Sequence, residues 1–251
     1  MLKKTTTLMV FVAFITFLSG NFIQVAYAEH PLISEDIGTL GVGVNQIELN
    51  TDWLKDGRTK SRVGSLTLMR GVAEDLDVYI NTPATLSSPS GVDDIDLGFK
   101  WRFFEADNFF MGIRPELRLA SGDQQKELGD GKSGAALTFV TQYELGSFTW
   151  LFNLGSERHR FSDPTRAALQ REYVNKTSLA TLYAINKQWT VLVDVGKQSH
   201  ALKSEKSPEA IVFGVIYHLD DDADMDIGYK KALNHTEVDR QIGVGVTWRF
   251  K

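Results

Sequence analysis

The chain has 251 residues, 43% hydrophobic and 24% charged, with no cysteine and a formal net charge of -5. This composition excludes a multi-pass helical membrane protein, which needs several runs of about 20 apolar residues. The acidic charge also disfavours nucleic acid as a partner, because neutralising phosphates needs clustered Lys and Arg. A transmembrane β-barrel is not excluded, since its strands are apolar only at alternate positions.

The first 28 residues are predicted to be a cleaved secretory signal peptide. Lys3 and Lys4 form its basic start, an apolar stretch follows at 8–18, and Ala26-Tyr27-Ala28 is a small-x-small cleavage site. The alternative is a single membrane anchor, but the apolar stretch is too short to span a bilayer. We therefore expect residues 29–251 to form one exported barrel domain that needs no disulfide.

From residue 38 onward, apolar residues alternate with small or polar ones. In the last segment Ile242, Val244, Val246 and Trp248 are apolar, whereas the residues between them are small or polar. Successive side chains of a strand point to opposite faces, so this pattern predicts one apolar and one polar face. Twelve such segments are predicted, at 39–53, 61–71, 75–84, 93–104, 108–121, 133–145, 147–160, 174–186, 188–199, 208–219, 224–233 and 238–250.

The even number of strands, each close to the roughly 10 residues that cross a bilayer, predicts an all-β fold. Specifically, we expect a transmembrane antiparallel up-and-down barrel of about 12 strands. The alternation slips around Asn45-Gln46, which predicts a bulge there. Short turns alternate with longer connections, the longer ones being at 54–60, 85–92, 122–132, 161–173, 200–207 and 234–237. This is the pattern of a barrel with periplasmic turns and external loops.

Aromatic residues provide an independent test of this orientation. Interfacial aromatics should gather next to the turns, where a ring can be half apolar and half wet. Ten lie within a few residues of a predicted turn or of the C-terminus: Phe103, Phe109, Tyr143, Phe148, Trp150, Tyr183, Trp189, Tyr217, Trp248 and Phe250. The alternative explanation, that strands favour aromatics in general, predicts scatter along the strands instead.

The polar face should line the lumen. Its predicted members are Asp96, Lys100, Arg102, Arg114, Glu116, Arg118, Gln142, Glu144, Asp194, His218, Asp226, Lys230 and Arg249. Two consecutive strands bring five of these together as candidates for a constriction, namely Lys100, Arg102, Arg114, Glu116 and Arg118. They could select solutes or form a salt-bridged filling that holds the barrel closed. Twelve strands lie between the filled and the open barrel classes, so we expect a narrow or partly plugged pore.

Motifs for catalysis or metal binding are weak. The five histidines show no ligand spacing. Gly131-Lys132-Ser133 lacks the first glycine of a phosphate loop, and the acidic run at 220–224 is better explained as a solvated turn than as a calcium site. A hydrolase pair of Ser156 with His159 or His218 is conceivable. We expect no catalytic residue, no cofactor, no metal and no enzyme activity.

Several motifs resemble the outer-membrane proteins grouped as the MetA-pathway of phenol degradation family of transporters. The resemblance is carried by residues 36–41, 91–102, 120–123, 128–131 and 152–155, in which Gly and Asp recur at turns. The family usually has Pro-Thr-Gly-Asp where this chain has Ala120-Ser121-Gly122-Asp123. The resemblance implies a barrel for the uptake or export of small, aromatic or hydrophobic compounds.

Together these patterns predict a channel or transporter in the outer membrane of a Gram-negative bacterium, passing small molecules through a narrow charged lumen. Its expected partners are outer-membrane lipid, a small-molecule solute and, during insertion, the barrel assembly machinery. The alternatives are a structural or surface-binding barrel with a filled lumen, whose active surface would be the loops at 54–60, 85–92 and 161–173, and an outer-membrane hydrolase.

Overall fold

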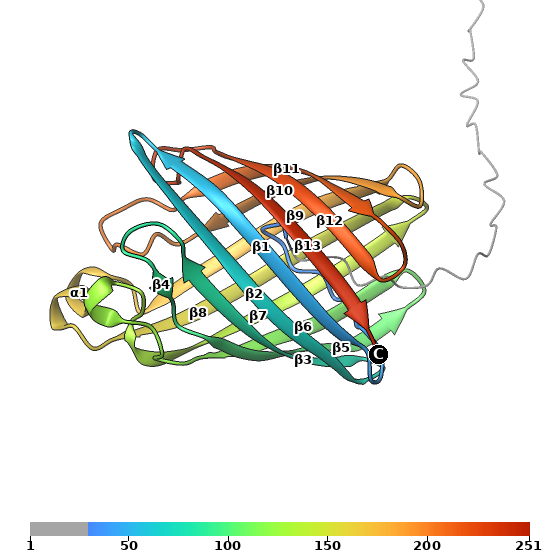
Figure 1. Ribbon diagram of the computed structural model, residues 1–251, viewed down its shortest axis with the longest axis horizontal. Coiled ribbons are helices and arrows are strands. Elements are labelled where there is room, and N and C mark those ends of the chain that lie inside the picture. Colours follow the sequence, from blue (N-terminus) through green and yellow to red (C-terminus); the bar gives the residue numbers. More distant parts are fainter. Residues whose placement is uncertain (1–29) are drawn as a thin grey trace, which may run out of the picture.

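The computed structural model describes residues 30–251, so the predicted signal peptide lies outside the described residues. These residues form a closed antiparallel barrel (Figure 1). Its strands are β1 (Asn45–Asp56), β2 (Thr59–Ala73), β3 (Leu76–Thr85), β4 (Gly91–Val92), β5 (Asp96–Ala106), β6 (Phe109–Arg118), β7 (Gly131–Leu145), β8 (Phe148–Phe161), β9 (Tyr173–Ala184), β10 (Trp189–Gln198), β11 (Glu209–His218), β12 (Ala223–Ala232) and β13 (Arg240–Phe250).

The wall has 12 strand positions, which confirms the predicted fold class. The two-residue β4 pairs with the end of β3, and β5 pairs with the rest of β3, so these two strands share one position. Closure comes from β1, which pairs with β2 on one side and with β13 on the other. Each remaining strand pairs with its neighbours in the chain.

The predicted alternation of side chains is confirmed along the wall. On β13, Val244, Val246 and Trp248 are 38%, 47% and 54% exposed, whereas Thr247 and Arg249, at alternate positions, are 0% and 7% exposed. Apolar side chains therefore cover the outside and polar ones the inside, which is the arrangement that a lipid surround and a wet lumen favour.

Two details at the start of the barrel differ from the prediction. The wall begins at Asn45 rather than at residue 39, because Gly41 and Gly43 adopt left-handed φ values of 79° and 81° that end an extended strand. The bulge predicted at Asn45-Gln46 is wrong, since β1 pairs with both neighbours from Asn45 onward without a shift. The register shifts lie elsewhere, between Gly71/Ala73, Arg102/Phe104 and Lys132/Ala135.

The connections form a turn end and a loop end of the barrel. The prediction of a long loop at 54–60 is wrong: β1 and β2 continue to a tight turn at Gly57-Arg58, where Gly57 has φ +56°. Longer loops at the same end contain a 3-10 helix, η1 (Gln124–Lys126), and a short α-helix, α1 (Pro164–Leu169). Within residues 30–251, no helix has the length and apolar character needed to cross a membrane.

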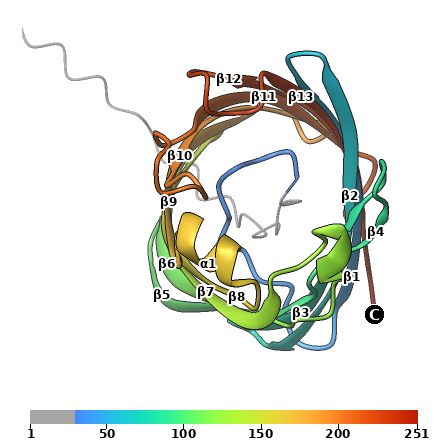
Figure 2. The same ribbon diagram turned by 90° about the vertical axis from the view of Figure 1, so that its left-hand side faces the viewer.

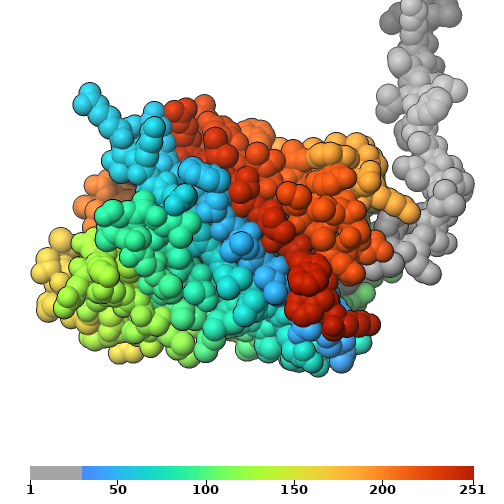
Figure 3. All heavy atoms as spheres, viewed as in Figure 1, coloured from blue at the N-terminus to red at the C-terminus, as the bar shows by residue number. Residues whose placement is uncertain are grey.

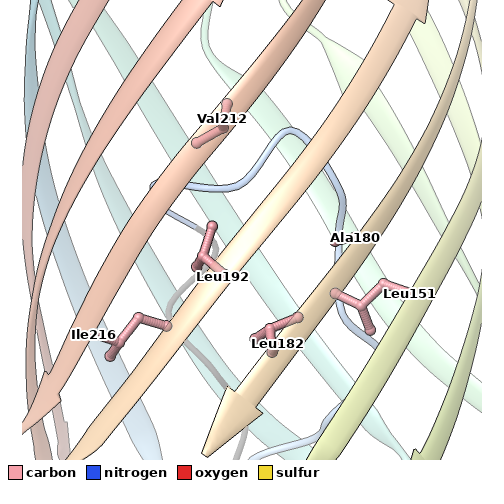
Figure 4. Close-up of a cluster of buried hydrophobic side chains, with 6 residues drawn as sticks. All are labelled: Leu151, Ala180, Leu182, Leu192, Val212 and Ile216. Carbon is pink, nitrogen blue, oxygen red and sulfur yellow. The ribbon is translucent and has the colours of Figure 1, made fainter.

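One part of the inner wall is apolar. Leu151, Ala180, Leu182, Leu192, Val212 and Ile216, from β8 to β11, form a buried cluster on the inside (Figure 4). Each is at most 3% exposed, and Leu32 packs against them. The lumen is thus not uniformly polar, contrary to what strict alternation predicts.

The aromatic residues gather at the turn end as predicted. Outward rings contact one another across neighbouring strands, with centroids 4.7 Å apart for Phe148 and Tyr183 and 4.6 Å apart for Trp189 and Tyr217. The last strand contributes Trp248 and Phe250, 4.9 Å apart. These half-exposed rings form the belt that the membrane interface favours.

Candidate functional site in the barrel lumen

Residues 30–43, here called the luminal segment, precede the wall. Residues 30–40 lie inside the barrel, and Gly41, Val42 and Gly43 form a turn at its turn end, where Val42 is 57% exposed. Figure 2, which faces the loop end, shows this segment as the blue trace enclosed by the strands. It begins with His30, whose ring contacts Asp226 on β12, and it ends where the backbone N–H of Gly43 donates to the carbonyl of Gly71 on β2 at 2.9 Å. The segment therefore passes along most of the inner wall before it enters β1.

Along residues 33–40, wall side chains rather than a partner strand accept most of the backbone hydrogen bonds of the luminal segment. The backbone N–H groups of Ile33 and Ser34 donate to the carboxylate of Asp194 at 2.7 and 2.6 Å. The amide of Asn153 accepts from the N–H of Glu35 at 2.6 Å and donates to the Glu35 carbonyl at 3.0 Å. Farther along, Gln142 accepts from Ile37 and Asp77 accepts from Leu40. Buried backbone donors need such acceptors, so these polar side chains hold the segment in place.

Two of the five predicted constriction residues bind the luminal segment. Lys100 Nζ lies 3.1 Å from Asp36 Oδ1, and both side chains are at most 2% exposed. Arg114 pairs with Glu35, donates from Nε to the Tyr79 hydroxyl at 2.6 Å, and lies 4.5 Å from the centre of that ring. The cations of β5 and β6 thus pair with acidic residues of the luminal segment, which the alternation along the strands does not indicate.

The other three predicted residues have partners within the wall. Arg118 Nε lies 2.9 Å from Asp96 Oδ1, and Glu116 Oε1 lies 3.5 Å from an Arg114 nitrogen. Arg102 pairs at 3.2 Å with Glu105, which is half exposed near the turn end. The structure brings Arg114, Glu116 and Arg118 to one cavity, and it places Lys100 and Arg102 away from it.

That cavity has a volume of about 270 Å³ and lies between the luminal segment and the walls of β1, β2, β3, β5, β6 and β8. Its charged lining residues are Glu35, Glu48, Asp96, Arg114, Glu116, Arg118, Glu157 and His30. Most of the remaining lining is neutral and polar, including Asn50 and Asn81. Such a lining can hydrogen-bond water or a small polar solute.

A second anchor of the luminal segment was also missed. The ring of His30 contacts Asp226 through Nδ1 and lies 3.2 Å from Asp52 through Nε2. Gln241 donates to the same Asp52 carboxylate at 2.8 Å. The sequence pattern placed Asp226 on the inner face without a partner, and carboxylates inside a lumen need one. An unpaired carboxylate at this luminal position was therefore the feature of the sequence that could have indicated another segment inside the barrel.

The loops at the loop end are tied together by two aspartates. Asp94 accepts from the backbone N–H groups of Gly122 and Asp130, both at 2.9 Å. Asp130 in turn pairs with Arg166 of α1 at 3.0 Å and with His159 of β8 at 2.8 Å. The glycine and aspartate motifs of 91–102, 120–123 and 128–131 thus form one contact network.

Two carboxyl groups in these loops have shifted pKa values. The backbone N–H groups of Arg166 and Thr165 donate to Asp163 at the start of α1 and hold the pKa of that carboxyl below its usual range. Burial raises the pKa of Asp93, between β4 and β5, and the neighbouring charge of Asp94 adds to the rise. Asp163 therefore remains an ionised cap of α1 at mildly acidic pH.

The described residues do not assemble a hydrolase pair from Ser156. Ser156 stands opposite Leu137, which is half exposed on the outer face, whereas His159 is three residues away on the inner face. His218 lies at the turn end beside Asp224. Among residues 30–251, no group of three His, Asp or Glu side chains could hold a metal ion.

Comparisons with known proteins agree with this architecture. The family model described as "Putative MetA-pathway of phenol degradation" matches residues 38–250. The COG4313 outer membrane channel from Pseudomonas putida F1 has a TM-score of 0.67 at 13% identity, over 86% of this chain and 98% of that chain. The NanC porin has a TM-score of 0.60 at 10% identity, over 82% of this chain and 99% of that chain.

A third similar structure is the KdgM porin in complex with disordered oligogalacturonate, with a TM-score of 0.60 at 8% identity, over 82% of this chain and 99% of that chain. At these identities the matches show a shared barrel fold. No curated protein matches the chain.

Proposed function

The chain belongs to the family described as "Putative MetA-pathway of phenol degradation", and we propose that it is a passive outer-membrane channel for small polar solutes in a Gram-negative bacterium. The observation that carries this proposal is the polar cavity of about 270 Å³ beside the luminal segment. A barrel that served only as a scaffold could fill that space with packed side chains, as small barrels do.

In this proposal the luminal segment forms the narrowest part of the pore together with β5 and β6. Arg114, Glu116 and Arg118 contact the passing solute, since they line the cavity, while Lys100 positions the segment through Asp36. Arg102 contributes at the turn end of the same pore. Passage is diffusion and needs no cofactor and no bond chemistry.

The mixed charge of the cavity favours solutes that both donate and accept hydrogen bonds. Hydroxylated aromatic acids meet this requirement, because their carboxylate and hydroxyl can bind Arg118 and Glu116 while the ring remains small. Their aromatic character also agrees with the compounds that the family description implies. A purely hydrophobic cargo would have to leave these charged groups without solvent, which is costly.

Single-channel recording in planar bilayers tests the proposal. We expect a small conductance from residues 29–251. The conductance should be several-fold larger when residues 30–40 are removed, because that variant lacks the part of the luminal segment that narrows the pore. Removal of loop 122–132 is the matched control, since this loop lies at the rim. Entry of 4-hydroxybenzoate into liposomes, compared with a neutral sugar, then tests the solute class.

If none of the three chains conducts ions, the channel proposal is wrong. That result supports the second candidate, a structural or surface-binding barrel with a filled lumen. The observation that favours this second candidate is the ordering of the loops through Asp94 and Asp130, which provides a rigid external surface.

A further inference from the structure

Five basic side chains gather on the outer wall near the loop end. Lys60, Lys55, Arg240 and Lys231 stand directly opposite one another across β2, β1, β13 and β12. Arg62 lies one step below them, opposite Trp53, which is 46% exposed on the outer face. Because alternate residues share a face, all five point outward. Figure 3 shows this side of the barrel, with the four strands crossing it diagonally.

This cationic row has no acidic counterpart in the part of the chain that the structure describes. None of its five members forms an ion pair within residues 30–251. The nearby Asp239 accepts from the backbone N–H of Gly57 at 2.9 Å. Like charges directly opposite each other on neighbouring strands are destabilising. Binding of an anion from outside the chain would therefore reduce the repulsion among these five cations.

An apolar groove of about 880 Å³ lies on the same outer wall. Its part on β1, β2 and β3 lies next to the cationic row, and it continues toward Trp189, Tyr217 and Met225 at the turn end. Small residues form its floor: Thr51 stands opposite Gly64, which stands opposite Ala84. Leu49 and Leu66, 59% and 38% exposed, border this floor one step farther from the loop end. Small side chains between larger ones thus create a depression in the lipid-facing surface.

The groove and the row form one continuous surface. Arg62 is two residues from Gly64 on β2, a rise of about 7 Å along a strand. Leu86, which also lines the groove, donates its backbone N–H to the Arg62 carbonyl at 2.8 Å. Anionic groups at the row would therefore be at the right height for attached acyl chains to enter the groove.

We propose that this surface binds one phosphorylated glycolipid of the outer leaflet, with its phosphates on the cationic row and acyl chains in the groove. Charge complementarity selects this occupant, because a neutral headgroup would leave five cations uncompensated at the membrane boundary. The proposal needs the barrel to sit in the outer membrane with its loop end outward, but it does not need solutes to pass through the lumen.

Native mass spectrometry of residues 29–251 with added bisphosphorylated lipid A tests the proposal. We expect one lipid to remain bound, and its affinity to fall at least about tenfold when Lys55, Lys60, Arg62, Lys231 and Arg240 are all replaced by Gln. The matched control replaces five other exposed basic residues by Gln, namely Lys132, Arg160, Lys187, Lys206 and Lys251. This control removes the same charge and should bind as the unmodified chain does.

A second pair of variants tests the groove without changing charge. Thr51→Leu with Ala84→Leu fills the floor and should weaken lipid A binding several-fold. Thr141→Leu with Ala135→Leu is the matched control on β7, where the Thr141 hydroxyl also donates to a neighbouring carbonyl, as that of Thr51 does. If the fivefold charge variant does not fold, these two variants still test whether lipid A binds at this surface.

Three results would overturn the proposal. The first is equal binding of lipid A by the charge variant and its control, and the second is equal binding of lipid A from which both phosphates have been removed. The third is complete displacement of lipid A by millimolar inorganic phosphate, which would show a simple anion site. Each result is independent of whether the chain conducts ions, so this proposal and the channel can fail separately.

Discussion

At the scale of single residues, the pair of Lys100 and Asp36 is the most deeply buried charge contact of the lumen. Both side chains are at most 2% exposed. Asp77, another buried carboxylate, also interacts electrostatically with Lys100. A buried ion pair adds little net stability compared with apolar residues, but loss of one partner is costly. The pair therefore specifies where the luminal segment docks more than it stabilises the wall.

Replacement of Lys100 by Met should lower the free energy of unfolding by about 3 to 5 kcal/mol, because Asp36 would remain buried without its cation. The double variant Lys100→Met with Asp36→Asn should recover part of this loss, because the buried carboxylate of Asp77 still lacks the nearby cation. Urea titration in detergent micelles measures both. Lys197→Met is the control and should cost about 1 kcal/mol or less, since Lys197 and its partner Glu209 are 55% and 38% exposed. Equal losses for Lys100→Met and Lys197→Met would contradict this role.

At the scale of elements, period-two alternation predicted about 12 strands and the face that most of their side chains occupy, but it missed the two-residue β4 and began the first strand at residue 39 instead of Asn45. The luminal segment escaped because Gly38, Leu40, Val42 and Val44 alternate like a strand and continue into β1. The partners of Lys100 and Arg114 could not be predicted for the same reason, since Glu35 and Asp36 were not expected inside the barrel. Local patterns specify faces, but contacts across a lumen depend on the closed structure.

The luminal segment itself is held by a few acceptors, of which Asp194 is the most important. Asp194→Ala removes the acceptor of two backbone N–H groups and of the Ser34 hydroxyl. Unsatisfied buried donors cost about 1 to 3 kcal/mol, so the segment should open about tenfold or more often. Cleavage after Glu35 by a Glu-specific protease measures this opening.

Asp194→Asn keeps one acceptor oxygen and should show an intermediate cleavage rate. The barrel wall should remain intact in both variants, because the neighbours of β10 pair with it through backbone bonds. An unchanged rate in Asp194→Ala would show that the segment is held by its ion pairs instead.

At the scale of the whole molecule, the barrel separates an apolar exterior from a polar interior with a single layer of strands. Val193 on β10 and Val72 at the turn end are 42% and 44% exposed, so both would face lipid in a bilayer, one near its centre and the other at its edge. Exposure alone does not distinguish them, but depth in a membrane does.

Val193→Arg should therefore destabilise the barrel by about 2 to 4 kcal/mol in lipid vesicles, and Val72→Arg by about 1 kcal/mol or less. Urea unfolding in phosphatidylcholine vesicles measures the difference. The same two variants in detergent micelles serve as the reference without a fixed membrane depth. Equal costs in vesicles would be inconsistent with a transmembrane position of the wall.

The route of the luminal segment also constrains how the chain can fold. Glu35 and Asn153 are 118 positions apart in the sequence, and His30 and Asp226 are 196 apart. The segment precedes every strand, yet its docking surface is complete only after β12 has joined the sheet. Contacts between residues so far apart in the sequence form late in folding. The luminal segment is thus among the last parts of the chain to reach its native position, although it is synthesised before the strands. Barrel closure therefore sets the time at which the lumen acquires its final shape.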